Sequence, residues 1–161
     1  MRVRIVVADQ NEADFYELEQ RDMPPRFVQR LEDADAHLHN RDLKSDRPGR
    51  VFDHAPTPGG RRGAVGHHST GGERNPRKVE AIRFARRIAD ALDEERRDHR
   101  YERLVIMAPP AFLGFLRKEM PAAVQAMLTA EIGKDLVHEP PDALSGYLPP
   151  GTFTRHPVIG D

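Results

Sequence analysis

The 161-residue sequence contains no cysteine. Disulfides, thiolate catalysis and zinc sites with cysteine ligands are therefore excluded, which suits a reducing compartment. The sequence also lacks a long hydrophobic run, because its longest apolar region, residues 104–116, is interrupted by Pro109 and Pro110 and falls short of the roughly 20 residues that a membrane span needs. The N-terminus, MRVRIVVADQN, does not resemble a signal peptide. We therefore expect a soluble cytoplasmic protein that has no membrane partner.

Strand signals dominate the N-terminal part of the chain. Residues 3–8 (VRIVVA) are apolar and β-branched and end at a turn signal, residues 9–11, which predicts a buried strand. Residues 15–18 predict a second strand, and residues 27–28 mark a third that cannot begin before the prolines at 24–25. The short connections favour an antiparallel meander.

The clearest predicted helix begins near residue 75 and runs to about Arg97. Asn75 is a good N-cap and Pro76 suits the first helical position. The apolar stripe of this helix consists of Val79, Ile82, Ala85, Ile88, Ala89 and Leu92, with Phe84 on its flank.

Further elements follow the long helix. The pattern predicts a buried strand at 104–108, a short helix at 111–118, a helix from Pro121 that carries Val124, Met127 and Leu128 on one side, a strand at 130–137 and a small helix containing Leu144 and Tyr147. Helices that alternate with strands favour an α/β fold. We expect one α/β domain over residues 1–147, with a long basic loop at 39–76 and an irregular tail at 148–161.

The segment from His39 to Lys78 differs in charge from the rest of the chain. It contains nine Lys or Arg and four acidic residues, for a net charge of +5. Because the whole chain carries −1, the remainder carries −6. A basic segment on an acidic body favours an anionic partner such as a phosphate backbone.

The run NRDLKSDRPGR at 40–50 is the most specific part of this segment. Arg41, Arg47 and Arg50 can make forked contacts to phosphates, with Asp42 and Asp46 holding the arginines in place. The alternative is a salt-bridge cluster that braces the base of the loop. His37, His39, His67 and His68 could bind a metal, but they lack a metalloprotease-type spacing and are more simply explained as solvated side chains.

The sequence resembles the bacterial family named "protein required for attachment to host cells". The resemblance covers about residues 2–144 and lies in short motifs that occur in the same order: VVAD at 6–9, NRDL at 40–43, SDRPGR at 45–50, FA at 84–85, APP at 108–110, FLG at 112–114, EI at 131–132 and KDL at 134–136.

Members of this family are similar to the middle domain of archaeal and eukaryotic class-1 peptide release factors. That similarity implies a ribonuclease H-like mixed sheet of about five strands flanked by helices. In release factors the corresponding loop carries a Gly-Gly-Gln tripeptide that promotes hydrolysis of peptidyl-tRNA in the ribosome. Here the nearest sequence is Gly71-Gly72-Glu73, in which a normally charged Glu replaces Gln.

The resemblance implies an RNA- or ribosome-associated protein, with the ribosome or tRNA as partner and peptidyl-tRNA ester hydrolysis as its reaction if it is an enzyme. The alternative is a non-catalytic interaction protein in attachment to host cells or in its regulation. We expect no cofactor and no metal. The expected RNA contacts are Arg41, Lys44, Arg47, Arg50, Arg61 and Arg62, the expected loop supports are Asn40, Asp42, Asp46 and Gly49, and Gly71, Gly72 and Glu73 are the catalytic candidates.

Overall fold

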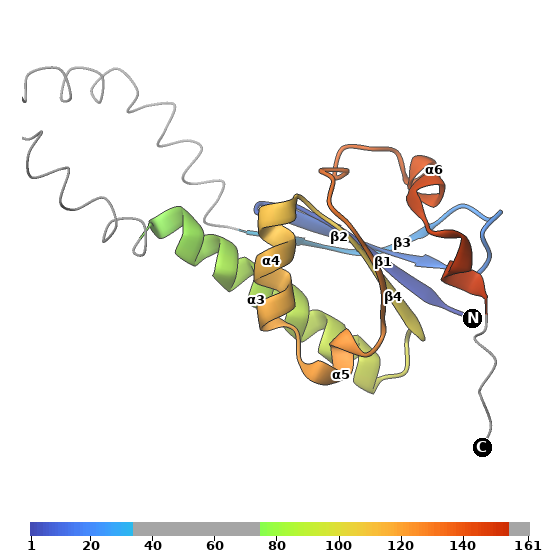
Figure 1. Cartoon of the computed structure of the whole chain (residues 1–161), viewed down its shortest axis with the longest axis horizontal. Helices are drawn as coiled ribbons and strands as arrows, with labels where there is room; N and C mark the ends of the chain where they lie inside the picture. Colours follow the sequence, from blue (N-terminus) through green and yellow to red (C-terminus); the bar gives the residue numbers. More distant parts are fainter. Residues whose placement is uncertain (34–74, 155–161) are drawn as a thin grey trace, which may run out of the picture.

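The computed structural model describes residues 1–33 and 75–154. They form one α/β domain around a five-stranded mixed sheet with strand order β3-β2-β1-β4-β5 (Figure 1). This confirms the predicted fold class, a mixed sheet of about five strands flanked by helices. The strands are β1 (Val3–Ala8), β2 (Glu12–Leu18), β3 (Arg26–Glu32), β4 (Arg103–Met107) and β5 (Leu128–Ile132).

The direction of each strand follows from the length of the connection before it. Short turns link β1 to β2 and β2 to β3, and both pairs are antiparallel, which confirms the predicted meander. Helical connections precede β4 and β5, so β4 runs parallel to β1, and β5 runs parallel to β4. The carboxyl ends of β1, β4 and β5 therefore lie at the same end of the sheet.

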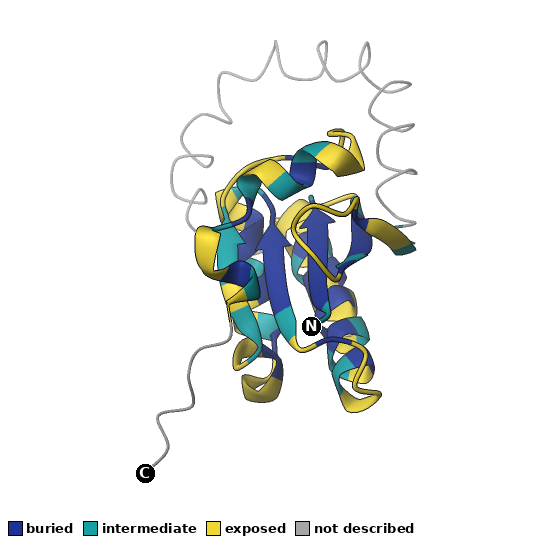
Figure 2. Ribbon diagram, turned by 90° about the vertical axis from the view of Figure 1, so that its right-hand side faces the viewer, coloured by how far each residue is buried: buried dark blue, intermediate teal, exposed yellow. Residues whose placement is uncertain are grey.

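Three helices cover one face of the sheet: α3 (Pro76–Arg97), α4 (Pro110–Glu119) and α5 (Ala122–Gln125). As predicted, Asn75 caps α3, with its side chain accepting a hydrogen bond from the Arg77 amide at 3.0 Å, and Pro76 is the first helical residue. Between α3 and α4 the rings of Phe84 and Phe112 stack, with centroids 6.2 Å apart. Burial is concentrated in the strands and on the inner faces of the helices (Figure 2).

The apolar stripe of α3 differs at its start from the prediction. Val79 was expected in the core, but its side chain is 45% exposed, whereas Phe84, expected on the flank, is fully buried. The reason is length: 22 residues of helix span about 33 Å, which exceeds the reach of a seven-residue strand, about 23 Å. The first turns of α3 therefore extend beyond the sheet (Figure 1).

The second face of the sheet is covered by the segment that follows β5. It contains α6 (Pro141–Leu144) and two 3₁₀ helices, η1 (Ser145–Tyr147) and η2 (Pro150–Phe153), and it buries Leu136, Val137, Leu144 and Leu148 against the strands. The predicted strand at 130–137 was wrong in its extent, because β5 begins at Leu128 and ends at Ile132. The apolar residues after Gly133 are buried as an irregular covering, which sequence alternation does not distinguish from a strand.

Arg103 holds the end of this covering segment in place. Its guanidinium donates to the carbonyl oxygens of Gly151 at 2.9 Å and Thr152 at 2.5 Å, and also to that of Thr154. A cation placed on the free carbonyls at the end of a helix satisfies acceptors that have no other partner. Residues through Thr154 are thereby attached to the start of β4, whereas residues 155–161 lie outside the described residues.

A buried ion pair joins α3 to the middle of the sheet. The Nε atom of Arg4, on β1, lies 2.7 Å from a carboxylate oxygen of Glu95, and their side chains are only 2% and 6% exposed. Gln29, on β3, donates to the other Glu95 oxygen at 3.1 Å. The Arg4 guanidinium also lies over the ring of Tyr101, 6.0 Å from its centroid. Each charge is therefore compensated within the core.

Neutralising Glu95 should destabilise the fold strongly. Glu95→Gln leaves the Arg4 charge buried without a counter-charge, so we expect a loss of about 3–5 kcal/mol in the free energy of unfolding by urea denaturation. The double variant Arg4→Met with Glu95→Leu should lose much less than the sum of the single changes. Arg97→Gln is the control, because it breaks an exposed pair with Asp93 and should leave stability close to that of the wild type. Additive single and double effects would contradict a coupled pair.

The Tyr101 hydroxyl should lose its proton only at an unusually high pH. Burial, and then the nearby Glu95 carboxylate, raise the pKa of Tyr101 from 10.0 to about 12, and its hydroxyl donates to the Leu92 carbonyl at 2.9 Å. Because the unfolded chain loses this proton first, the contribution of Tyr101 to stability is complete below pH 10 and should be lost as the pH rises towards 12. A spectrophotometric titration of tyrosinate should show a late step that Tyr101→Phe removes. The same late step in that variant would assign it to Tyr16, whose pKa is also raised, chiefly by burial.

Candidate functional site

The candidate site lies where the carboxyl ends of β1 and β4 meet. The chain leaves β1 by a tight turn to β2 on one side, and it leaves β4 through α4 towards β5 on the other side. Neighbouring parallel strands whose connections diverge leave a crevice between them, and open α/β sheets bind ligands at such points.

A cavity of about 360 Å³ occupies this crevice. It is built by three segments: the β1–β2 turn, the start of α4 with the residue before it, and the irregular stretch after β5. The lining residues are Asp9, Gln10, Asn11, Pro109, Ala111, Phe112, Phe115 and Asp135. One wall is therefore polar and the other largely apolar, the division that small binding sites commonly show.

Asp9 shapes the polar wall. Its Oδ1 atom accepts hydrogen bonds from the amides of Asn11 at 2.7 Å and Glu12 at 2.9 Å, and its own amide donates to the Glu12 carbonyl at 2.9 Å. This side chain therefore fixes the turn through Oδ1 alone, and an asparagine at the same position offers the same acceptor. In the described part of the chain, no hydrogen bond engages Oδ2 of Asp9 or the carboxylate of Asp135, so both can receive a donor from a ligand.

The start of α4 forms the apolar wall. Pro109 is the N-cap and Pro110 the first helical residue, so neither presents a backbone N–H, whereas the N–H groups of Ala111 and Phe112 have no acceptor within the helix. Phe112 is buried and supports the wall from beneath through its stack on Phe84, and Phe115 is half-buried. The cavity therefore combines an aromatic surface with the N–H groups of the first turn of α4.

The described end that precedes residues 34–74 lies near this cavity. The amide of Asp33, just after β3, donates to the carbonyl of Asn11 at 2.8 Å, and Asn11 lines the cavity. The first helical turns of α3 project beyond the same end of the sheet (Figure 1). The cavity thus lies next to the end of β3.

The sequence-predicted site residues fall within that segment. All of them lie outside the described residues: Asn40, Arg41, Asp42, Lys44, Asp46, Arg47, Gly49, Arg50, Arg61, Arg62, Gly71, Gly72 and Glu73. The loop histidines considered for a metal, His37, His39, His67 and His68, also lie outside them. These predictions stay predictions.

The cavity residues were not recognised from the sequence as a site. Residues 9–11 indicated a turn, and the prolines at 109 and 110 indicated the end of a strand. A signal was present nonetheless: polar residues follow directly after a buried strand that is parallel to another, which is where α/β proteins place ligand-binding side chains. The parallel pairing of β1 and β4 was the missing information.

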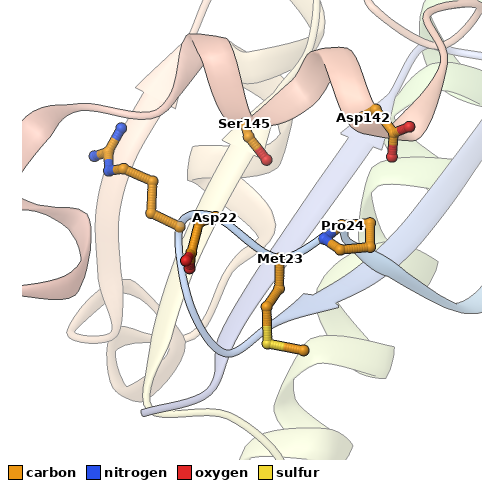
Figure 3. A pocket seen from close by; sticks show the side chains of 6 residues that line it. Asp22, Met23, Pro24, Asp142 and Ser145 are labelled. Atoms are coloured by element: carbon orange, nitrogen blue, oxygen red, sulfur yellow. The ribbon is translucent and has the colours of Figure 1, made fainter.

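A second cavity lies at the opposite end of the sheet (Figure 3). It measures about 370 Å³ and lies between the β2–β3 turn, which contributes Asp22, Met23 and Pro24, and the α6–η1 segment, which contributes Asp142 and Ser145. Arg21, from the same turn, spans to the covering segment and donates to the Pro149 carbonyl at 2.5 Å. This hydrogen bond ties the rim of the cavity to the C-terminal covering of the sheet.

Within residues 1–33 and 75–154, no group of three or more His, Asp or Glu side chains is placed to hold a metal ion. In the same residues, no helix has both the length and the apolar character that crossing a bilayer requires.

Comparison with protein families gives a match. The family model described as "Protein required for attachment to host cells" matches residues 4–148. No curated protein matches the chain. The matched region contains β2 to β5, all of β1 except Val3, and every residue that lines the cavity at the carboxyl ends of β1 and β4.

Proposed function

We propose that this chain, which belongs to the family of proteins required for attachment to host cells, acts in attachment as an interaction protein. It holds its partner in the cavity at the carboxyl ends of β1 and β4. The observation that supports this function is a cavity lined by carboxylate oxygens of Asp9 and Asp135 that have no hydrogen-bond partner among the described residues. The Asp9 carboxylate is held rigidly by its turn while one of its oxygens stays available. Rigid placement of this kind lowers the entropy lost on binding.

The cavity also rests on the stable part of the fold. Phe112 packs on Phe84 in the core, and Asp9 directly follows the fully buried β1. A site built on such elements keeps its shape without a partner. The proposed role is therefore recognition by a preformed surface.

Filling the cavity should abolish attachment. Ala111 is exposed and lines the cavity, so Ala111→Trp should occupy the space without removing a core contact. We expect a strain that carries this variant to attach to host cells no better than a strain that lacks the gene. Thermal unfolding of the purified variant should stay close to that of the wild type.

Ala123→Trp is the matched control, because Ala123 is an exposed alanine on α5 and does not line the cavity. Attachment by this strain should equal that of the wild type. Full attachment by the Ala111→Trp strain would contradict a role for the cavity.

A second candidate function is association with RNA or the ribosome, which the charge distribution favours. The +5 segment from His39 to Lys78 joins a remainder that carries −6, and Asp33, the last described residue before it, hydrogen-bonds to Asn11 at the cavity. An anionic polymer would be attracted to that segment and steered away from the acidic body. Hydrolysis of peptidyl-tRNA, with Gly71, Gly72 and Glu73 positioning water, belongs to this candidate.

Charge reversal in the basic segment tests the second candidate. The double variant Arg47→Glu with Arg50→Glu should weaken filter binding of tRNA and cosedimentation with ribosomes, and wild-type binding should fall as salt rises. Arg97→Glu with Arg100→Glu is a control of equal charge change on an exposed part of the body. Equal loss in both double variants would indicate a non-specific charge effect, and no loss in the Arg47/Arg50 variant would remove the segment from the interface.

A further inference from the structure

We infer that the cavity at the carboxyl ends of β1 and β4 binds an arginine side chain of a partner protein. This inference rests on the proposed function, because it names what the interaction site recognises. It is carried by the hydrogen-bonding character of the cavity, by its aromatic wall and by its size.

The polar side chains of the cavity carry negative charge. Oδ2 of Asp9 and both oxygens of Asp135 have no partner among the described residues, and the side-chain amides of Gln10 and Asn11 can accept or donate. At the start of α4, Pro109 and Pro110 supply no N–H, and the backbone donors are the N–H groups of Ala111 and Phe112. Two full carboxylate charges outweigh the partial positive charge of a helix start, so the cavity favours a cationic donor over an anionic group.

The apolar wall favours a flat cation. Phe115 is half-buried, and together with Pro109 it presents an apolar surface to the cavity that the carboxylates line. A guanidinium is planar, is weakly hydrated, stacks on aromatic faces and donates in a fork that matches a carboxylate. A lysine ammonium is a compact and strongly hydrated charge, so it would use the acceptors but gain less from the wall.

The size of the cavity suits one side chain. At about 360 Å³ it is near the lower end of the range for ligand sites, about 300–1,000 Å³. This volume accepts the head and stem of one arginine from a partner that covers the opening. The stem would lie along the apolar wall while the head reaches the carboxylates.

The same fold already uses both kinds of contact for its own arginines. Arg87 lies over the ring of Phe84, 5.6 Å from the centroid, and donates to the Glu32 carbonyl at 2.8 Å. Arg30 makes a forked contact to Asp14, with Nε–Oδ1 and NH2–Oδ2 distances of 2.6 and 3.0 Å. The cavity offers one site where an incoming arginine can make both contacts together.

A single tryptophan gives a direct readout, because the chain contains none. In the Phe115→Trp variant the new indole would report on the cavity while keeping its aromatic wall. We expect the peptide acetyl-Gly-Arg-Gly-amide to change the indole fluorescence with saturation. The matching citrulline peptide, which has the same shape without the charge, should bind about tenfold or more weakly. Phe153→Trp, half-buried on the covering segment, is the control reporter and should not respond.

Two further variants connect the signal to the carboxylates. Asp135→Asn and Asp9→Asn, each made in the Phe115→Trp background, should each weaken the arginine peptide about tenfold, and Asp9→Asn keeps the acceptor that holds the turn. Equal binding of the arginine and citrulline peptides, no saturable response, or unchanged binding in both variants would overturn the inference. Binding that appears only after Arg47 and Arg50 are replaced by Ser would also overturn it, because the chain's own arginines would then be the occupant.

The outcome is separable from that of the proposed function. If Ala111→Trp abolishes attachment but no arginine peptide binds, the cavity keeps its role and the identity of its ligand is wrong. If the peptide binds as described but Ala111→Trp strains attach normally, the ligand is right and the role in attachment is wrong.

Discussion

The position of α3 depends on the buried ion pair between Arg4 and Glu95. Two charges in the core are costly to desolvate, and they are tolerated only when each has its partner and the remaining acceptors are used. Gln29 satisfies the second Glu95 oxygen from a different strand. Any rotation or sliding of the helix would separate these groups. The pair therefore favours one position of α3 on the sheet over neighbouring positions.

The consequences extend from this pair to the candidate site. A fixed α3 places Phe84, Phe84 stacks on Phe112, and Phe112 supports the wall of the cavity at the start of α4. The opposite wall follows from β1 itself, since Asp9 is the first residue beyond a strand whose six residues are all buried. The site is thus assembled from the parts of the domain that have the least freedom to move.

Local patterns predicted the elements well because each had its own physical signal. The cap at Asn75, the proline at 76 and the β-branched run at 3–8 act within a few residues, and the structure has them where expected. The errors concern contacts between residues that lie far apart in the sequence. Val79 repeats at helical spacing yet lies beyond the sheet, and Leu136 and Val137 alternate like a strand yet pack as an irregular covering. Neither outcome can be known before the partners across the core are known.

The candidate site illustrates the same limit. The most obvious chemical feature of the sequence is the charge of residues 39–78. The cavity, in contrast, is built from a turn near the start of the sequence and from a helix start and an irregular stretch that follow about a hundred residues later. Asp9, which follows β1, and Asp135, which follows β5, line one cavity only when both strands lie beside β4 in the sheet. The release-factor resemblance concerns a fold and a loop, and the family match confirms only the host-attachment relationship.

The covering segment that Arg103 holds has a consequence for the order in which the protein matures. The apolar face formed by Val3, Ile5 and Val7 is synthesised well before the residues that shield it, from Leu136 to Leu148. During translation this surface is therefore exposed to solvent and to chaperones until the covering segment has emerged. A chain that terminates before Leu136 leaves this apolar face uncovered, where quality-control proteases can recognise it.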